Sequence, residues 1–247
     1  MQILLSPAKR MGNDFSEKSK LYSSPALIQT SAQILEVLKS YDAWELEKLL
    51  KVNPSLAIKA WKAFQEMNLS EGVIPAIYSY QGLAFKYLES SSLDFQSISW
   101  AQKHLWILSA FYGALRPLDL INPYRLEMGT KLSVSFSKNL YELWANQLYQ
   151  LIMKEHDIII NLASEEYAKC LRRYLKVDDE MVDVVFLENV KGKYRTLATS
   201  AKMARGKMTR FIIKNKLSKI NEIQSFDSLG YHYDVCRSSL KKMVFIK

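Results

Sequence analysis

The sequence predicts a mixed α/β fold: a compact mixed sheet covered by helices. Short apolar runs at residues 2–5 and 157–162 have the length and composition of buried strands. Longer stretches with helical periodicity separate them. At 247 residues, 49% of them hydrophobic, the chain is long enough to fill one core without needing a second. We therefore expect a single domain over residues 1–247.

The remaining elements follow from local patterns. Two strand-like runs, 181–187 and 194–199, flank Gly192 as a hairpin would, and residues 243–246 supply a last strand. Because strands and helices do not alternate as clean βαβ units, the sheet is expected to be mixed. Helical patterns predict helices at residues 25–40, 43–51, 54–67, 100–115, 138–154, 165–175 and 201–216.

Residues 42–67 predict two short helices joined by a very tight turn. Asp42 can cap the first helix with Glu45, and Asn53 can cap the second, which starts at Pro54. This resembles a helix-hairpin-helix, which offers a helix N-terminus to a DNA phosphate. The glycines usual in such a turn are absent, so a plain αα-hairpin is the alternative. The candidate DNA contacts of this element are Lys51, Asn53, Ser55 and Lys59.

The formal net charge is +9, and ten positive charges lie between residues 191 and 219 with no acidic residue among them. Such a stretch attracts polyanions, which include DNA, RNA, anionic lipid and phosphorylated small molecules; a solvated helix face is the alternative. Gly206 would permit either close approach by a ligand backbone or tight helix packing. The candidate DNA contacts here are Lys202, Arg205, Lys207 and Arg210.

Residues 108–129 combine two prolines with a dense set of charged and polar residues. This composition predicts either a polar site or an ion-pair network that holds the loop in place. The residues concerned are Arg116, Asp119, Asn122, Tyr124, Arg125 and Glu127.

Five strings occur in the order typical of one family, the YaaA family, and the sequence resembles it over nearly the whole chain. The resemblance implies a bacterial cytosolic protein of the peroxide stress response that limits damage from unincorporated iron. It also implies a compact mixed α/β fold with a positively charged cleft, a helix-hairpin-helix element, and binding of duplex DNA, including bent forms. The strings are Ser6-Pro7-Ala8-Lys9, Tyr112-Gly113 with residues 115–119, residues 123–129, residues 161–164 with Glu166-Tyr167, and residues 204–206 with Arg210-Phe211.

The same strings predict where the cleft lies. Ser6 and Lys9 follow the first strand, Asn161 and Ser164 belong to the end of another, and ligands bind beyond strand carboxyl ends in α/β sheets. An enzyme acting on a small anionic or nucleotide-like substrate is therefore the alternative function. Ser6, Lys9, Ser164 and Tyr167 would form its acid–base group. The expected cleft also includes Arg116, Tyr124, Arg125 and Glu127.

Standard catalytic signatures are missing, and we assign no catalytic residue, metal or cofactor. The histidines, His104, His156 and His232, are widely separated. Cys170 and Cys236 are expected to be reduced thiols in a cytoplasmic protein, and no apolar run is long enough to span a membrane. DNA, contacted through its backbone, is the expected partner, with a small anionic ligand in the cleft as a second.

Overall fold

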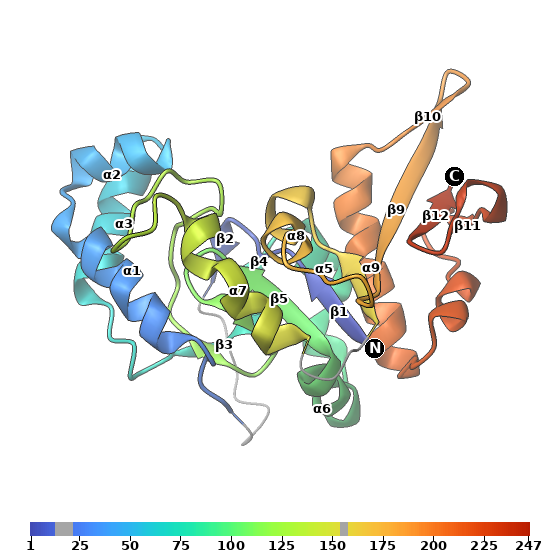
Figure 1. Ribbon diagram of the computed structural model, residues 1–247, viewed down its shortest axis with the longest axis horizontal. Coiled ribbons are helices and arrows are strands. Elements are labelled where there is room, and N and C mark those ends of the chain that lie inside the picture. Colours follow the sequence, from blue (N-terminus) through green and yellow to red (C-terminus); the bar gives the residue numbers. More distant parts are fainter. Residues whose placement is uncertain (13–21, 154–157) are drawn as a thin grey trace.

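The computed structural model describes residues 1–12, 22–153 and 158–247. Its centre is an eight-stranded sheet in the order β11-β12-β9-β8-β1-β5-β6, with β10 paired to β9 (Figure 1). The expected mixed α/β class is confirmed. The strands are β1 (Gln2–Leu5), β5 (Leu105–Ser109), β6 (Gly113–Leu115), β8 (Ile159–Leu162), β9 (Met181–Val190), β10 (Lys193–Arg195), β11 (His232–Tyr233) and β12 (Lys242–Ile246).

The middle of the sheet is parallel. β1 pairs with β5 and β8, β8 with β9, and β9 with β12, all in parallel register, whereas β6, β10 and β11 pair antiparallel. All four residues of β1 are buried, as expected for a strand covered on both faces. The carboxyl ends of β1, β8 and β9 therefore meet at one edge of the sheet.

Helices cover the sheet, and two small two-stranded sheets, β2 with β4 and β3 with β7, flank it. The 3-10 turns are η1 (Ser90–Ser92), η2 (Ile220–Ser225) and η3 (Val235–Arg237). The short strands are β2 (Arg10–Met11), β3 (Ile74–Pro75), β4 (Tyr80–Gln81) and β7 (Leu120–Ile121). The helices are α1 (Ile28–Ser40), α2 (Ala43–Leu50), α3 (Pro54–Glu66), α4 (Ala76–Ser79), α5 (Leu83–Leu88), α6 (Phe95–His104), α7 (Leu140–Ile152), α8 (Glu165–Arg172) and α9 (Ala198–Asn215).

The prediction of a helix at residues 100–115 is wrong. Helix α6 starts earlier, at Phe95, and ends at His104, after which the chain forms β5 and β6. The run from Leu105 to Ser109 is buried at every position and pairs with β1. A continuous apolar run fits a buried strand as well as a buried helix, so periodicity alone cannot separate them.

Helix α7 packs across the end of this strand pair. Trp144 is fully buried, and its indole N–H donates to the carbonyl of Ala110 at 2.9 Å. Gly113 has φ +76°, and a Cβ there would come within 2.8 Å of the Trp144 ring. The expected boundaries at Lys154 and Asp157 lie outside the described residues.

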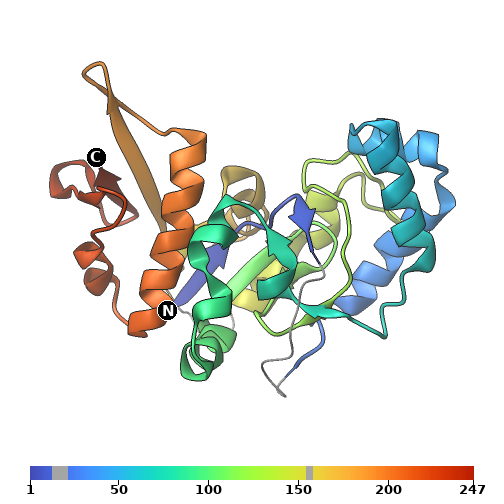
Figure 2. The ribbon, with the colours of Figure 1, turned by 180° about the vertical axis from the view of Figure 1, so that it is seen from behind.

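The capping predicted around the α2–α3 turn is present. Asp42 and Glu45 form a reciprocal capping box, and the Asn53 side chain accepts a hydrogen bond from the Leu56 amide at 2.9 Å. Lys51, at the turn, adopts the left-handed conformation. Figures 1 and 2 place this α2–α3 hairpin at one end of the long axis and α9 with the β9–β10 hairpin toward the other.

Candidate functional site

A pocket of about 380 Å³ lies at the carboxyl ends of β1 and β8. Its walls come from five separated segments: residues 5–10, 81–85, 124–127, 162–167 and the start of α9. Strand ends of a parallel sheet are where α/β proteins bind ligands, because the connections diverge there. The fold thus builds a concave site from distant parts of the chain.

This pocket brings together most of the residues that the sequence suggested for the cleft, together with two from the basic helix. Asn161 and Arg116 do not line it. The residues that do are Ser6, Lys9, Tyr124, Arg125, Glu127, Ser164, Tyr167, Lys202 and Arg205.

The two serines join the ends of the neighbouring strands. The Ser6 hydroxyl accepts a hydrogen bond from the Ser164 amide at 2.8 Å and donates to the Ser164 hydroxyl at 3.2 Å. Ser164 is the N-cap residue of α8, and Ser6, directly after β1, satisfies its amide. Both hydroxyls lie at the pocket wall, so one short bridge fixes the floor of the site.

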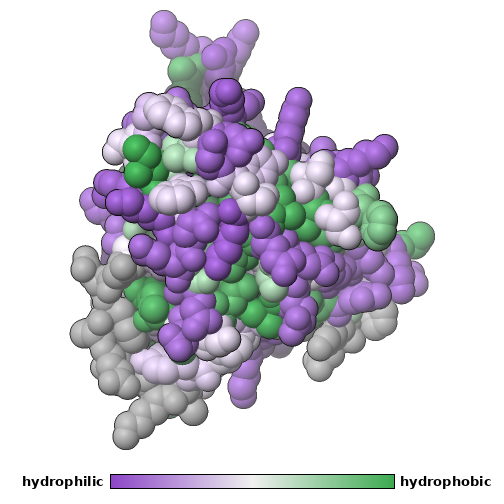
Figure 3. All heavy atoms as spheres, turned by 90° about the vertical axis from the view of Figure 1, so that its left-hand side faces the viewer, coloured by the Kyte–Doolittle hydropathy of each residue, from purple (hydrophilic) through white to green (hydrophobic). Residues whose placement is uncertain are grey.

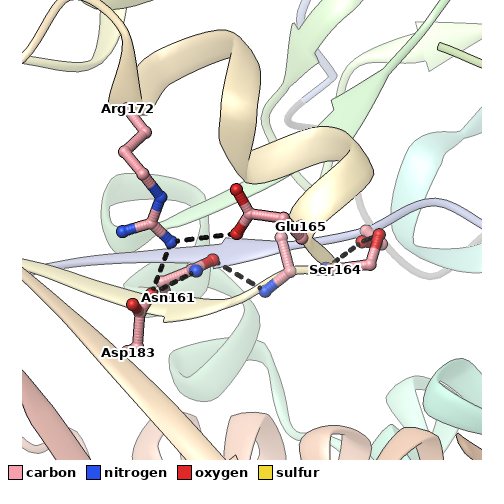
Figure 4. A network of polar contacts seen from close by, with 7 residues as sticks. Asn161, Ser164, Glu165, Arg172 and Asp183 are labelled. Atoms are coloured by element: carbon pink, nitrogen blue, oxygen red, sulfur yellow. Dashed lines mark hydrogen bonds and ion pairs between the residues drawn. The ribbon is translucent and has the colours of Figure 1, made fainter. Parts of the chain in front are cut away.

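Asn161 stabilises the end of β8 through its side chain. Its amide group donates to Asp183 on β9 at 2.7 Å and accepts from the Ala163 amide at 3.0 Å. Arg172 donates to Glu165 at 3.3 Å, which joins the two ends of α8, and to Asp183 at 2.9 Å, which binds the carboxyl end of α8 to β9 (Figure 4). Asn161 therefore positions the strand end and does not face the pocket.

Arg116 lies elsewhere, so its assignment to the cleft is corrected. Its guanidinium stacks on the Trp106 ring at 3.4 Å and donates to the Gln2 side chain at 3.2 Å and the Lys103 carbonyl at 2.9 Å. Gln2 begins β1, whereas the pocket lies beyond its end. The amide of Arg116 donates to buried Asp119, which also accepts from Ser23. Arg116 and Asp119 hold the loop, while Tyr124, Arg125 and Glu127 line the pocket.

An ion pair closes one side of the pocket mouth. The Lys9 ammonium lies 2.7 Å from Glu127, and the Arg125 guanidinium lies 3.9 Å from the same carboxylate. Arg125 also donates to the Lys9 carbonyl at 3.1 Å. The Lys9 side chain is 64% exposed, so Lys9 is a surface partner of Glu127.

Tyr124 and Tyr167 contribute aromatic surface. The Tyr124 hydroxyl is buried in a chain with Ser109 at 2.7 Å and Tyr80 at 2.9 Å, so its ring faces the pocket while its oxygen is engaged. Burial raises the pKa of Tyr124 to about 12, and burial raises the pKa of Tyr167 well above its usual value. Both phenols stay protonated at neutral pH.

Helix α9 forms the opposite wall. Arg205 is partly buried there, and its Nε has no hydrogen-bond partner in the described part of the chain. Burial lowers the pKa of Arg205, but the guanidinium remains charged at neutral pH. Exposed Lys202 lies one turn away. The two side chains give this wall two positive charges.

Two other cations of α9 are held within the protein. Lys207 lies 2.6 Å from Glu89, and Arg210 lies 3.6 Å from the same carboxylate while donating to the carbonyls of Leu88 and Glu89. They secure the end of α5. Gly206, just before Lys207, packs directly on the Ala84 backbone, which decides its role in favour of tight helix packing.

The β9–β10 hairpin presents cations that the sequence analysis did not single out as contacts. Lys191, Lys193 and Arg195 are exposed, and the hairpin projects from the body of the molecule (Figures 1 and 2). Because β9 runs parallel to β8 and β1, it leaves the sheet at the edge that holds the pocket. The sequence signal for these three residues is their position within the basic stretch 191–219. The fold is needed to show which charges of that stretch project from the protein.

The α2–α3 hairpin also exposes its candidate residues, Lys51, Asn53, Ser55 and Lys59. Its turn amides are used internally, since those of Lys51 and Val52 donate to Glu47 and the Leu56 amide donates to Asn53. Figure 3 looks onto this end of the molecule, where hydrophilic side chains surround smaller hydrophobic areas. The hairpin can therefore bind a polyanion chiefly through the charges of Lys51 and Lys59.

The family model for peroxide stress protein YaaA matches residues 1–236. The chain is a member of the YaaA family. It is 40% identical to a UPF0246 protein of Lachnoclostridium phytofermentans over 247 residues, which is all of this chain and 96% of that protein. It is 40% identical to a UPF0246 protein of Agathobacter rectalis, over 99% of this chain and 98% of that protein. It is 38% identical to a UPF0246 protein of Pediococcus pentosaceus, over 100% of this chain and 98% of that protein.

The role of the YaaA family is in peroxide stress. In this family member no described helix is long and apolar enough to cross a bilayer. Among residues 1–12, 22–153 and 158–247, no three His, Cys, Asp or Glu side chains gather as a metal site.

Proposed function

We propose that this YaaA family member binds duplex DNA through its phosphates, without reading sequence, as its part in the peroxide stress response. The observation that carries the proposal is the placement of Lys191, Lys193 and Arg195. They are exposed on a projecting hairpin at the same sheet edge as the pocket. Cations that neutralise phosphates provide the sequence-independent part of DNA affinity.

The charges at this edge reinforce one another. Exposed Lys202 follows the hairpin on α9, and exposed Arg10 lines the pocket. Arg237 stacks over Tyr194 of β10 at 4.2 Å, but Asp234 pairs with its charge, as Glu127 pairs with that of Lys9. We call Lys191, Lys193, Arg195 and Lys202 the basic edge. A local excess of one sign of charge raises the rate at which polyanions are captured.

The α2–α3 hairpin enters the proposal only through Lys51 and Lys59. These lie toward the other end of the long axis, so they would contact a different part of a bound duplex. Lys207 and Arg210 are left out of the contact surface because Glu89 already binds them. The proposal extends to limiting the DNA damage that unincorporated iron causes under peroxide, as the family resemblance implies.

Fluorescence anisotropy of a labelled duplex across a salt series tests the proposal. The test variant combines Lys191→Glu with Lys193→Glu. The control combines Lys241→Glu with Lys242→Glu, an equal change in charge at exposed lysines where β12 begins, at the opposite edge of the same sheet.

We expect the test variant to bind about tenfold or more weakly at low salt, and the slope of log affinity against log salt to fall by about 1.8 for two lost contacts. The control should change affinity by less than about threefold, through net charge alone. Equal losses in the two variants, or no duplex binding by the parent protein at low salt, would refute the proposal.

A second candidate is an enzyme acting on a small anionic substrate. The size of the pocket favours it, since about 380 Å³ suits a small molecule and cannot admit a duplex. Under this proposal Arg205 and Arg125 would hold the anion, and the basic edge would steer it in.

A further inference from the structure

Acidic and basic side chains both line the pocket. The carboxylates are those of Glu127, which is paired with Lys9, and of Glu166, which accepts a hydrogen bond from the Gly129 amide at 3.0 Å. Helix α9 supplies Lys202 and Arg205. Glu165 and Glu166 also occupy the first turn of α8, where they compete with any anion for that helix terminus. A bound anion therefore belongs at the α9 wall.

Between these charged side chains the lining is largely apolar and aromatic. Leu5, Phe85 and Leu126 contribute aliphatic and aromatic surface, and the rings of Tyr124 and Tyr167 complete it. The Tyr124 oxygen is turned into the core, so the pocket receives chiefly its ring. Aromatic side chains can contact nucleobases whatever the identity of the base.

Two of the arginines that line the pocket have a guanidinium nitrogen without an acceptor among the described residues. The Nε atoms of Arg205 and Arg125 are buried and have no hydrogen-bond partner within the described residues, although both side chains line the pocket. An unsatisfied buried donor is costly, and a charged one more so. An oxyanion at the α9 wall would offer acceptors to the Arg205 guanidinium, whereas Arg125 lies beside Lys9 and Glu127.

We infer that the pocket holds a single nucleotide unit, with the base among Phe85, Tyr124 and Leu126 and the phosphate at Lys202 and Arg205. The Ser6 and Ser164 hydroxyls and the carboxylates of the other wall face the polar edge of the base, whose N–H groups donate hydrogen bonds. The volume of about 380 Å³ suits one unit and excludes a base pair. The nucleotide has two possible sources. If it is an unpaired nucleotide of bound DNA, the inference rests on the proposed function; the other source is a free nucleotide.

The test makes two comparisons of ligands with the full-length protein. Isothermal titration calorimetry measures binding of dTMP against inorganic phosphate. Anisotropy measures a duplex with one bulged nucleotide against the fully paired duplex of the same sequence. The variants are Arg205→Gln, Lys202→Gln and Leu83→Trp, the last filling the pocket from α5. The control is Lys86→Gln, an exposed lysine of α5 outside the pocket lining.

We expect the parent protein to prefer the bulged duplex by about tenfold, as stacking of one base allows. Leu83→Trp should abolish the preference while the paired duplex still binds, and Lys202→Gln should weaken dTMP binding even if Arg205→Gln does not fold. Binding of dTMP without a bulge preference would support the free-nucleotide source.

Three outcomes would overturn the inference: neither dTMP binding nor a bulge preference, phosphate binding as tight as dTMP binding, or equal effects of Leu83→Trp and Lys86→Gln. If the parent protein binds dTMP but no duplex, the proposed function is wrong and the assignment of the pocket to a nucleotide is still supported.

Discussion

Gly206 on α9 lies so close to Ala84 on α5 that a Cβ at residue 206 would overlap the Ala84 carbonyl oxygen. This contact joins the two pocket walls that come from residues 81–85 and from the start of α9. Glu89 reinforces it by holding Lys207 and Arg210 at the end of α5. The shape of the pocket therefore depends on how closely these two helices pack.

Replacing Gly206 by alanine should destabilise the protein by about 2 kcal/mol or more. Alanine favours a helix by about 1 kcal/mol over glycine, but here the helices must separate to admit the methyl group. Urea unfolding measures the effect. Gly129→Ala is the control, since a Cβ there meets only Glu166 at 3.5 Å; equal losses in both variants would contradict the packing explanation.

Asp119 should make stability depend on pH. Burial raises its pKa from 3.8 to about 6, so between those values the folded protein holds a proton that the unfolded chain has lost. Stability contributed by Asp119 is therefore fully present below about pH 4 and is lost as pH rises through 6. At about 1.4 kcal/mol per pH unit over this interval, the change is at most about 3 kcal/mol.

The measurement for Asp119 is the free energy of unfolding between pH 4 and 7, compared with that of Asp119→Asn. The difference between the two proteins should change over this range in favour of the parent as pH falls. A difference that stays constant with pH would show that the carboxyl titrates at its ordinary pKa.

Removing the cap of α3 should cost stability. Asn53→Ala leaves the Leu56 amide without its side-chain acceptor, for a loss of about 1 kcal/mol in urea unfolding. Asn53→Asp keeps an acceptor and should stay close to the parent. If Asn53→Ala instead weakened duplex binding at unchanged stability, Asn53 would contact DNA and not act as a cap.

Arg116→Gln should separate structure from binding. The variant loses the stacking on Trp106 and the hydrogen bonds to Gln2 and Lys103, so its thermal midpoint should fall by several degrees. Affinity for duplex and for dTMP should remain within about twofold of the parent. A specific loss of dTMP affinity would return Arg116 to the pocket.

Local sequence signals predicted local structure well. The caps at Asp42 and Asn53 depend on residues only three positions away, and the structure contains both. The run from Leu105 to Ser109 was misassigned because its strand character comes from β1, about a hundred residues distant. Sequence alone cannot show such a partner.

Some contacts of the candidate site could likewise be predicted from the sequence, and others could not. Ser6 and Ser164 could be placed together because strand ends of a parallel sheet share an edge. The neutralisation of Lys207 and Arg210 could not be foreseen, since Glu89 is 118 residues from Lys207. Residues 81–85 carry no motif and were missed, although Gly82 before an apolar pair was a signal for a helix start.

The strand order has a consequence for synthesis on the ribosome. β1 leaves the exit tunnel first, yet its neighbours β5 and β8 begin at Leu105 and Ile159, and the α9 wall of the pocket begins only at Ala198. The nascent chain must therefore carry an unpaired, wholly apolar strand interior until more than a hundred further residues have emerged. A chaperone that shields Ile3, Leu4 and Leu5 during translation would raise the yield of native protein, and no truncated product would contain the finished pocket.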